Sequence, residues 1–264
     1  VRGLCTDKSN PEIFDVVDVY GNIYDSDIHH NHFGMYTYGH QQGDWRRNKM
    51  HDNTEYIHYN EVYNNGNHGI IASKRCNGVS IQGNEVYGGA EKSVGIFLHR
   101  SSDDAVVRGN YAHDNGDAGI AMMEVFDSEI SDNVFEDNKY GMRMSVGCAN
   151  NVFENNLFSN SEKYNVYTYE GTDLPWTVSS ARPQDNLITG NTMIGGRETI
   201  KLTVADGTEF IDNTFEGATT VRFENSTSTV MSGNTGLDDA DLELKVTEGS
   251  CFDQSSDPLF TPTC

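Results

Sequence analysis

The chain has 264 residues, an apolar fraction of 36% and a formal net charge of −22 at pH 7. Such an acidic chain excludes nucleic acid as its main partner, because a phosphate backbone needs a basic protein face. The low apolar fraction, together with 26 glycines, is poor for a globular α/β core and suits a thin solenoid. No apolar run approaches the ~18 residues that would span a bilayer.

Residues 1–20 follow no repeat, and we expect them to lie along the first coil or to join an upstream cap, since solenoid ends must be covered. The chain opens on Val1 rather than on an initiator Met, which favours a mature or excised portion.

From residue 21 to about residue 245 one pattern recurs: Asn-x-apolar, a polar Asn/Asp/Gly turn, then Gly-apolar-x-apolar. The copies begin at Ser26, Asn48, Asn60, Asn84, Asn110, Asn133, Asn156, Asn191, Asn213 and Asn234. Most steps are 21 to 26 residues, and self-similarity at such a period indicates a solenoid whose units cannot bury their apolar faces alone. We therefore predict an all-β solenoid of about ten coils over residues 21–245, with a capping tail at residues 246–264.

Two steps depart from this period. The step of 35 residues contains an extra loop at residues 168–186. The step of 12, from Asn48 to Asn60, is too short, because three strands with their turns need roughly 18 residues or more. About half a coil is missing there, so we predict a break in the chain with Tyr56 and Ile57 far apart, or a pinched solenoid if the two residues are bonded.

Strand alternation sorts the side chains of each coil inward and outward. Counted from the repeat glycine, the first and third positions should point into the core. They are Met35 and Thr37, Ile70 and Ala72, Ile96 and Leu98, Ile120 and Met122, and Met142 and Met144. The second and fourth positions, such as Phe97 and His99, should face outward.

One outer face thus gathers aromatic and cationic side chains on neighbouring coils, as a linear polymer site requires. Its predicted members are Tyr36, Tyr38, His40, Lys74, Arg75, His99, Arg100 and Arg143. All nine histidines precede residue 114, and we expect them to mark the same location, with the later coils acting as scaffold. Arg46 is either a substrate clamp or an ordinary charged edge.

The remaining polar and cysteine signals favour structural roles. We expect the repeat asparagines to sit at turns with positive φ and to bond their own backbone. No ligand motif supports calcium, no metal site is predicted and no cofactor is required. Cys251 and Cys264 could join in a disulfide or stay free, whereas Cys76 and Cys148 should pack as small apolar residues.

A cationic face lined with Tyr and His, on an acidic solenoid, suits an acidic polysaccharide. The natural reaction on a uronate begins with removal of the weakly acidic C5 proton, so a cation such as Lys74 or Arg100 must first offset the neighbouring carboxylate. Tyr or His can then act as the base. Reprotonation from the opposite face gives epimerisation, and expulsion of the C4 oxygen gives β-elimination.

Several segments resemble the mannuronan C5-epimerases in their brown-algal form, over most of residues 1–245. They include NPEIFDVVDVYG, GMYTYGHQQGDWRRNKMHDN, NGNHGIIASKRC, GIFLHRSSDDAVV and NKYGMRMSVGC. The resemblance implies a right-handed parallel β-helix, a secreted protein of the extracellular space or cell wall, and alginate as substrate. We expect a monomer that contacts neither nucleic acid nor membrane.

In that family a Tyr-Gly-x-Asp-Pro-His motif carries the chemistry, and the basic residue closing HGII-x-Ser-(Lys/Arg) neutralises the carboxylate. Lys74 matches the neutraliser and Tyr56 the first motif residue, but Gly-x-Asp-Pro-His does not follow Tyr56. The candidate catalytic residues are Tyr56, Lys74, His68, His99 and Arg100. The candidate substrate-binding residues are Tyr36, Tyr38, His40, Arg46, Arg75 and Arg143. The sequence leaves three activities open: C5-epimerase, alginate lyase in the same groove, or a non-catalytic alginate-binding β-helix.

Overall fold

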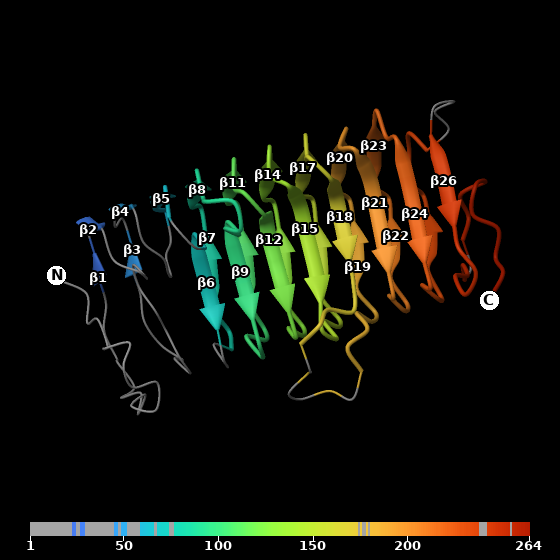
Figure 1. Cartoon of the computed structure of the whole chain (residues 1–264), viewed down its shortest axis with the longest axis horizontal. Helices are drawn as coiled ribbons and strands as arrows, with labels where there is room; N and C mark the ends of the chain where they lie inside the picture. The colour runs from blue at the N-terminus through green and yellow to red at the C-terminus, as the bar shows by residue number, and fades with distance from the viewer. Residues whose placement is uncertain are drawn as a thin grey trace.

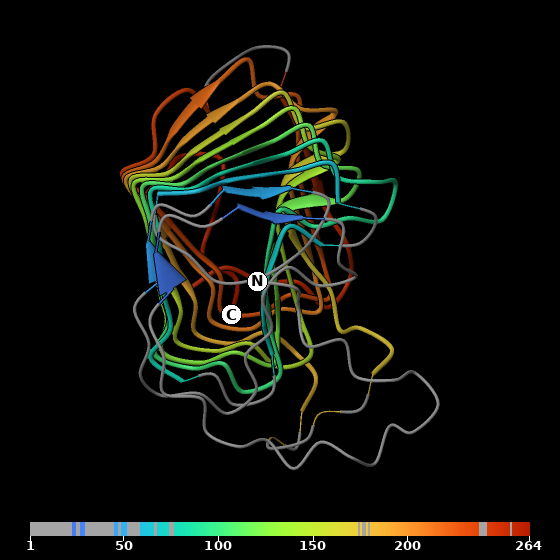
Figure 2. The ribbon, with the colours of Figure 1, turned by 90° about the vertical axis from the view of Figure 1, so that its left-hand side faces the viewer.

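A computed structural model describes residues 59–65, 68–73, 77–173, 175, 178, 180–237, 242–253 and 255–264, with the backbone of four short strands between residues 23 and 51. The chain winds into an elongated parallel β-solenoid (Figure 1). Viewed along its long axis, the coils superpose around a common interior (Figure 2).

Three long sheets run along the solenoid, and every paired strand is parallel to its neighbour. The first sheet contains β7 (Ser80–Gln82), β10 (Val106–Arg108), β13 (Glu129–Ser131), β16 (Val152–Glu154), β19 (Leu187–Thr189), β22 (Glu209–Ile211) and β25 (Val230–Ser232). The second contains β2 (Asp27–His29), β4 (Lys49–His51), β5 (Glu61–Tyr63), β8 (Glu85–Tyr87), β11 (Tyr111–His113), β14 (Val134–Glu136), β17 (Leu157–Ser159), β20 (Thr192–Ile194) and β23 (Thr214–Glu216).

The third sheet contains β6 (Ile70–Ser73), β9 (Ile96–His99), β12 (Ala118–Met123), β15 (Tyr140–Ser145), β18 (Tyr164–Thr168), β21 (Glu198–Thr203), β24 (Thr220–Glu224) and β26 (Glu243–Val246). Two further strands, β1 (Ile23–Tyr24) and β3 (Trp45–Arg46), pair with each other. With eight strands in the third sheet, the part that the structure describes makes about eight turns, rather than the ten predicted from the repeat count.

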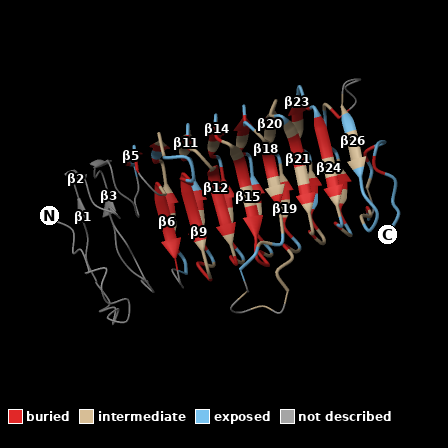
Figure 3. Ribbon diagram, in the orientation of Figure 1, coloured by how far each residue is buried: buried red, intermediate tan, exposed pale blue. Residues whose placement is uncertain are grey.

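The core follows the predicted alternation. In the three-residue strands of the first two sheets whose side chains are described, the middle residue is always buried, as in Ile130 and Phe135. In the third sheet, the first and third positions after the repeat glycine are at most 1% exposed from β6 to β15, which confirms the inward prediction for those coils. These side chains form one continuous hydrophobic cluster. Buried residues recur from strand to strand along the solenoid (Figure 3).

The repeat asparagines have a structural role, and the predicted mechanism is wrong in part: Asn110 and Asn191 do donate to the carbonyl two residues before them, but the φ angles are not positive. They stack directly on one another from coil to coil: the Asn133 side-chain carbonyl accepts from the Asn110 backbone and amide nitrogens, both at 2.9 Å. None of the described repeat asparagines has positive φ. The residue before each of them has it instead, for example Asp132 (φ 56) and Asn155 (φ 54). An Asx or Gly residue therefore makes the corner in each described coil except before Asn60, where Tyr59 (φ 59) does, and the asparagine after the corner is free to form a buried amide ladder.

The long step behaves as predicted. β18 ends at Thr168 and β19 begins at Leu187, and the intervening loop projects beyond the ends of the strands (Figure 1). Across the short step, β4 and β5 are direct neighbours in register in the second sheet, with Met50 opposite Val62. Tyr56 and Ile57 lie outside the described residues, so the predicted separation between them stays a prediction.

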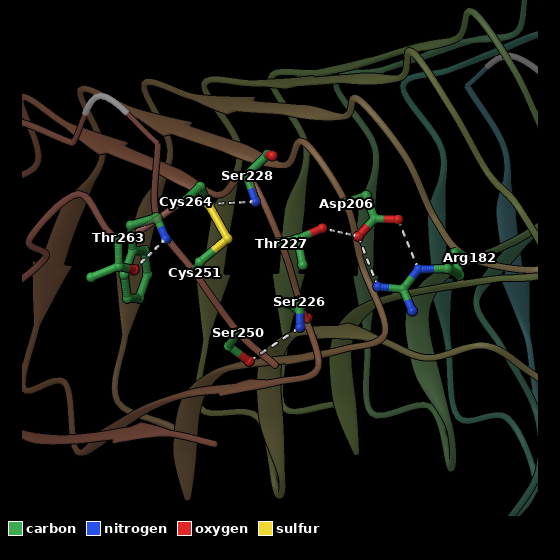
Figure 4. Close-up of a disulfide and its surroundings, with 10 residues drawn as sticks. Arg182, Asp206, Ser226, Thr227, Ser228, Ser250, Cys251, Thr263 and Cys264 are labelled. Atoms are coloured by element: carbon green, nitrogen blue, oxygen red, sulfur yellow. Dashed lines mark hydrogen bonds and ion pairs between the residues drawn. A yellow bond between two sulfur atoms is a disulfide. The ribbon is translucent and has the colours of Figure 1, made fainter. Parts of the chain in front are cut away.

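The C-terminal tail covers the end of the core. Phe252 and Phe260 pack edge-on against Phe223, with ring centroids 5.0 and 5.9 Å away. A disulfide joins Cys251 to Cys264, which confirms that alternative (Figure 4). Cys148 is a free, fully buried thiol, as expected of a small apolar residue.

Candidate functional site on the third sheet

The register of the strands determines which side chains lie beside one another on the outer face of the third sheet. Because the strands pair without slippage, Ile71, Phe97, Ala121 and Arg143 form one outward row across β6, β9, β12 and β15. Ser73, His99, Met123 and Ser145 form a second row near the strand ends. The prediction that His99 and Arg143 share one face is confirmed.

The same face is less open and less polar than predicted. Ile71 and Phe97 are each 8% exposed, and Ala121 is 1% exposed. They form a second apolar cluster with Val94 and Ala118, separate from the core. The first outward row of β6, β9 and β12 therefore forms a buried apolar floor, and the titratable groups lie around it.

His68 lies at one edge of this floor, just before β6. Its ring meets Phe97 edge-on with centroids 5.0 Å apart, and its Nδ1 accepts a hydrogen bond from the Val94 backbone at 3.1 Å. Burial, and then the positive charge of Arg143, lower the pKa of His68 from 6.5 to about 4. His68 is therefore neutral at pH 7, and with Nδ1 accepting, its proton is on Nε2. In this arrangement His68 is a hydrogen-bond donor rather than a ready base.

His99 and Arg100 form the next group, at the end of β9. His99 Nδ1 lies 2.9 Å from Ser73 Oγ, and the Arg100 Nε donates to His99 Nε2 at 3.3 Å. Arg100 also reaches across the face, where its Nη2 lies 3.1 Å from Asp173 Oδ2 in the long loop. The Asp173 carboxylate therefore occupies a position at which an anionic group can bind Arg100.

Arg143, on β15, is held by two partners. Its Nη2 lies 2.7 Å from Asp117 Oδ2, and both side chains are mostly buried, at 19% and 16% exposure. Its Nη1 donates to the Tyr169 hydroxyl. The Arg143 Nε is buried and has no hydrogen-bond partner among the described residues, so one donor of this guanidinium is unused.

A cluster of tyrosines continues the face beyond Arg143, where the sequence indicated only scaffold. Tyr140, Tyr164, Tyr167 and Tyr169 stack in a chain of ring contacts with centroids 5.0 to 5.7 Å apart. The ammonium groups of Lys139 and Lys163 each lie 5.8 Å from the Tyr140 ring centroid. The signal that could have found the cluster was the YNVYTY stretch over residues 164–169, which places three tyrosines within six residues.

The structure brings together only some of the predicted site residues. His68, His99, Arg100 and Arg143 lie on the third-sheet face. Tyr36, Tyr38, His40, Tyr56, Lys74 and Arg75 are outside the described residues. The backbone of Arg46 lies in β3, which is not part of the third sheet. The roles of all these residues stay predictions.

The prediction that the histidines mark one location is wrong. His29, His51 and His113 occupy one register row of the second sheet, with Tyr63 and Tyr87 between His51 and His113. The Tyr87 ring stacks on that of His113 with centroids 5.0 Å apart. Clustering in the sequence could not reveal this, because each coil visits three sheets.

The described residues form neither a metal-binding cluster nor a membrane-spanning helix. Over the described ranges, no group of three or more His, Cys, Asp or Glu side chains is arranged to hold a metal ion. Likewise, the described part of the chain has no helix long and apolar enough to cross a membrane.

Comparison with known proteins identifies the fold. Residues 22–179 match the family described as a right-handed β-helix region, and the chain belongs to this family. Among curated proteins, 3-dehydroshikimate dehydratase of Acinetobacter baylyi is 28% identical over 126 residues, which make up 44% of this chain and 24% of that protein.

Two solved structures show the same fold. The A-module of the Azotobacter vinelandii mannuronan C-5 epimerase AlgE4 has a TM-score of 0.52 at 14% identity, over 92% of this chain and 64% of that one. Tailspike protein 2 of Escherichia coli O157:H7 bacteriophage CAB120 has a TM-score of 0.56 at 10% identity, over 88% and 38%. The chain thus spans less than two thirds of each relative, and likeness at such identity concerns the fold alone.

Proposed function

We propose that the protein is an alginate-modifying enzyme, a mannuronan C5-epimerase that converts β-D-mannuronate residues of the polymer to α-L-guluronate. One observation carries the proposal. One face, over the four consecutive strands β6, β9, β12 and β15, holds two histidines and two anchored guanidinium groups. The histidines are His68, which is neutral, and His99, and the guanidinium groups are those of Arg100 and Arg143. The fold shared with the AlgE4 A-module adds support.

The cations fit the demands of the reaction. Removing the C5 proton places negative charge on the uronate carboxylate, so a fixed cation there stabilises the transition state more than the ground state. The Arg143 guanidinium, whose side chain is 19% exposed, is one such cation. Lys74 directly follows β6 in the chain, and we assign it the neutralising role on the sequence resemblance.

The assignment of the base follows from what His68 and His99 already do. The Nδ1 of His68 accepts from a backbone N–H, and Nε2 of His99 accepts from Arg100. We therefore propose Tyr56 as the base, with the Nε2–H of His68 donating a hydrogen bond to the sugar and His99 holding the Arg100 guanidinium in place. In the step, the C5–H bond breaks, the proton passes to the base, and the electron pair moves into the carboxylate. A solvent-derived proton then forms a new C5–H bond from the opposite face as the electron pair returns to C5, and the base releases its proton to solvent, so guluronate forms without change of mass.

The disulfide supports the proposal that the protein works outside the reducing cytosol. We propose a secreted monomer in the extracellular space or cell wall.

Incubation with polymannuronate tests the activity. Proton NMR should show guluronate signals growing at the expense of mannuronate, with no ultraviolet absorbance from unsaturated chain ends. Growth of that absorbance would instead make the protein a lyase, in which the C4–O bond breaks after the same proton transfer. Binding without either signal would leave a non-catalytic alginate-binding solenoid and overturn the proposal.

A further inference from the structure

Two aromatic clusters decorate the outside of this solenoid, and they differ in what surrounds them. The first lies on the second sheet, where Tyr63, Tyr87 and His113 stack and Tyr111 packs on His113. The second is the tyrosine cluster of the third sheet: Tyr140, Tyr164, Tyr167 and Tyr169.

The second-sheet cluster is internally satisfied and surrounded by acid. The Tyr87 hydroxyl donates to Glu61 at 2.8 Å, and the Tyr111 hydroxyl donates to Glu136 at 2.7 Å. His113 lies 2.7 Å from Asp114. These polar groups are occupied by carboxylates of the chain itself, so this surface would repel a polyanion.

The third-sheet cluster also has carboxylates nearby, Asp117 near Tyr140 and Glu224 near Tyr167, but they do not occupy the hydroxyls of these rings. All four rings are partly exposed, and the hydroxyls of Tyr140, Tyr164 and Tyr167 make no hydrogen bond with any described residue. Burial is the main reason that the pKa of Tyr140 is raised. Burial is also the main reason that the pKa of Tyr167 is raised to about 12. Both hydroxyls therefore stay protonated and can donate hydrogen bonds. The donors are therefore present but unused.

Two cations accompany these rings. The Lys163 backbone nitrogen donates to the Lys139 carbonyl at 2.9 Å, so the two lysines sit on adjacent rungs, ~4.8 Å apart along the solenoid. Neither ammonium group forms an ion pair with a carboxylate of the described chain, whereas Lys201, on the rung beyond, is paired with Glu224 at 3.1 Å. In a chain of net charge −22, two such lysines beside free hydroxyl donors are suited to an anionic ligand.

The cluster is continuous with the proposed site. Tyr167 is the register neighbour of Arg143, and Tyr169 accepts from the Arg143 guanidinium. A polymer lying along the third sheet and reaching His68 and Arg143 would therefore extend over the tyrosines.

We infer that Tyr140, Tyr164, Tyr167, Lys139 and Lys163 form a binding subsite for a linear polyuronate, which holds the chain beside the reacting residue without taking part in the chemistry. The ligand class follows from three features: partly exposed rings for the C–H faces of the sugars, unused hydroxyl donors for their oxygens, and cations on successive rungs for their carboxylates. This inference rests on the proposed function of the same face.

Equilibrium binding of polymannuronate at low salt tests it, with the full chain throughout. The Lys139→Ala/Lys163→Ala double variant should bind about fivefold more weakly and with less salt dependence. Tyr164→Ala should weaken binding about threefold to tenfold. Tyr164→Phe keeps the ring and removes the hydroxyl, so a partial loss there would identify the donor role rather than the packing.

The controls come from the other faces. Tyr87→Ala removes a stacked tyrosine of the second sheet, and Arg108→Ala removes an exposed cation of the first sheet. Both should bind as the wild type does, and unchanged thermal unfolding of all variants would show that each is folded. Equal losses in the controls, or wild-type binding by the folded cluster variants, would overturn the inference.

Measuring epimerisation of polymannuronate beside binding distinguishes a failure of this inference from a failure of the proposed function. If the wild type binds and the cluster variants lose binding, the subsite stands even when no C5 chemistry occurs. If the wild type epimerises and the cluster variants keep both its affinity and its KM, the subsite is refuted and the function stands. A wild type that binds no polymannuronate would refute both.

Discussion

The buried asparagine ladder should be a main source of the solenoid's stability, and Asn133 is its sharpest test. Asn133 is 1% exposed, and its side chain makes four hydrogen bonds at 2.9 Å. It accepts from the backbone and side-chain nitrogens of Asn110 and donates to the Val107 carbonyl and to Asn156. At about 1 kcal/mol net for each bond, with buried partners left unsatisfied, Asn133→Ala should lower the free energy of unfolding by ~3–5 kcal/mol.

The isosteric change Asn133→Asp should be at least as damaging at neutral pH. Its second oxygen would face the Val107 carbonyl and the Asn156 side-chain oxygen, both of which now accept from Asn133. Protonation supplies one donor, so lowering the pH should restore part of the loss relative to wild type. Glu209→Gln, an acid-to-amide exchange on an exposed strand position, should be nearly neutral and is the control. Urea unfolding followed by circular dichroism measures all three, and an Asn133→Asp variant as stable as the wild type at pH 7 would refute the ladder's role.

Three further predictions follow from the site and the cap. Lys74→Ala should lower kcat about a hundredfold or more with little change in KM, because the charge it offsets develops only in the transition state, and a raised KM with normal kcat would make Lys74 a binding residue only. The lowered pKa of His68 means that the unfolded chain takes up a proton below pH 6.5 while the folded chain does not until about pH 4. The free energy of unfolding should therefore fall as pH drops through that window, by up to about 3 kcal/mol from this group, and a His68→Gln variant with the same pH profile would contradict it. Cys251→Ser/Cys264→Ser opens a disulfide between cysteines 13 residues apart and should cost about 2–3 kcal/mol, measured as faster hydrogen exchange in β26 and the tail, with β12 unchanged as the internal control.

Repeat spacing and strand alternation were enough to predict the all-β solenoid, the inward residues of the third sheet and the long loop. These features are local, because a strand of period two fixes which side chains share a face once the repeat glycine is located. The disulfide was one of two alternatives for Cys251 and Cys264, and the folded tail decides between them.

The parts that failed depend on contacts between coils. The asparagine ladder needs the exact stacking of Asn110 on Asn133, which a single repeat unit does not contain. Nearness in sequence also misled, because His99 lies on the third sheet and His113 on the second. The tyrosine cluster was missed because Tyr169 lies beyond β18 in the long loop, and its contact with Arg143 spans 26 residues.

Solvent deuterium incorporation at C5 tests the proposed chemistry most directly. Polymannuronate incubated with the protein in D2O should give guluronate residues that carry deuterium at C5, with the H5 signal lost in proportion to conversion. Guluronate that retained its original proton at C5, or bound polymer that showed no exchange at all, would contradict proton abstraction on this face.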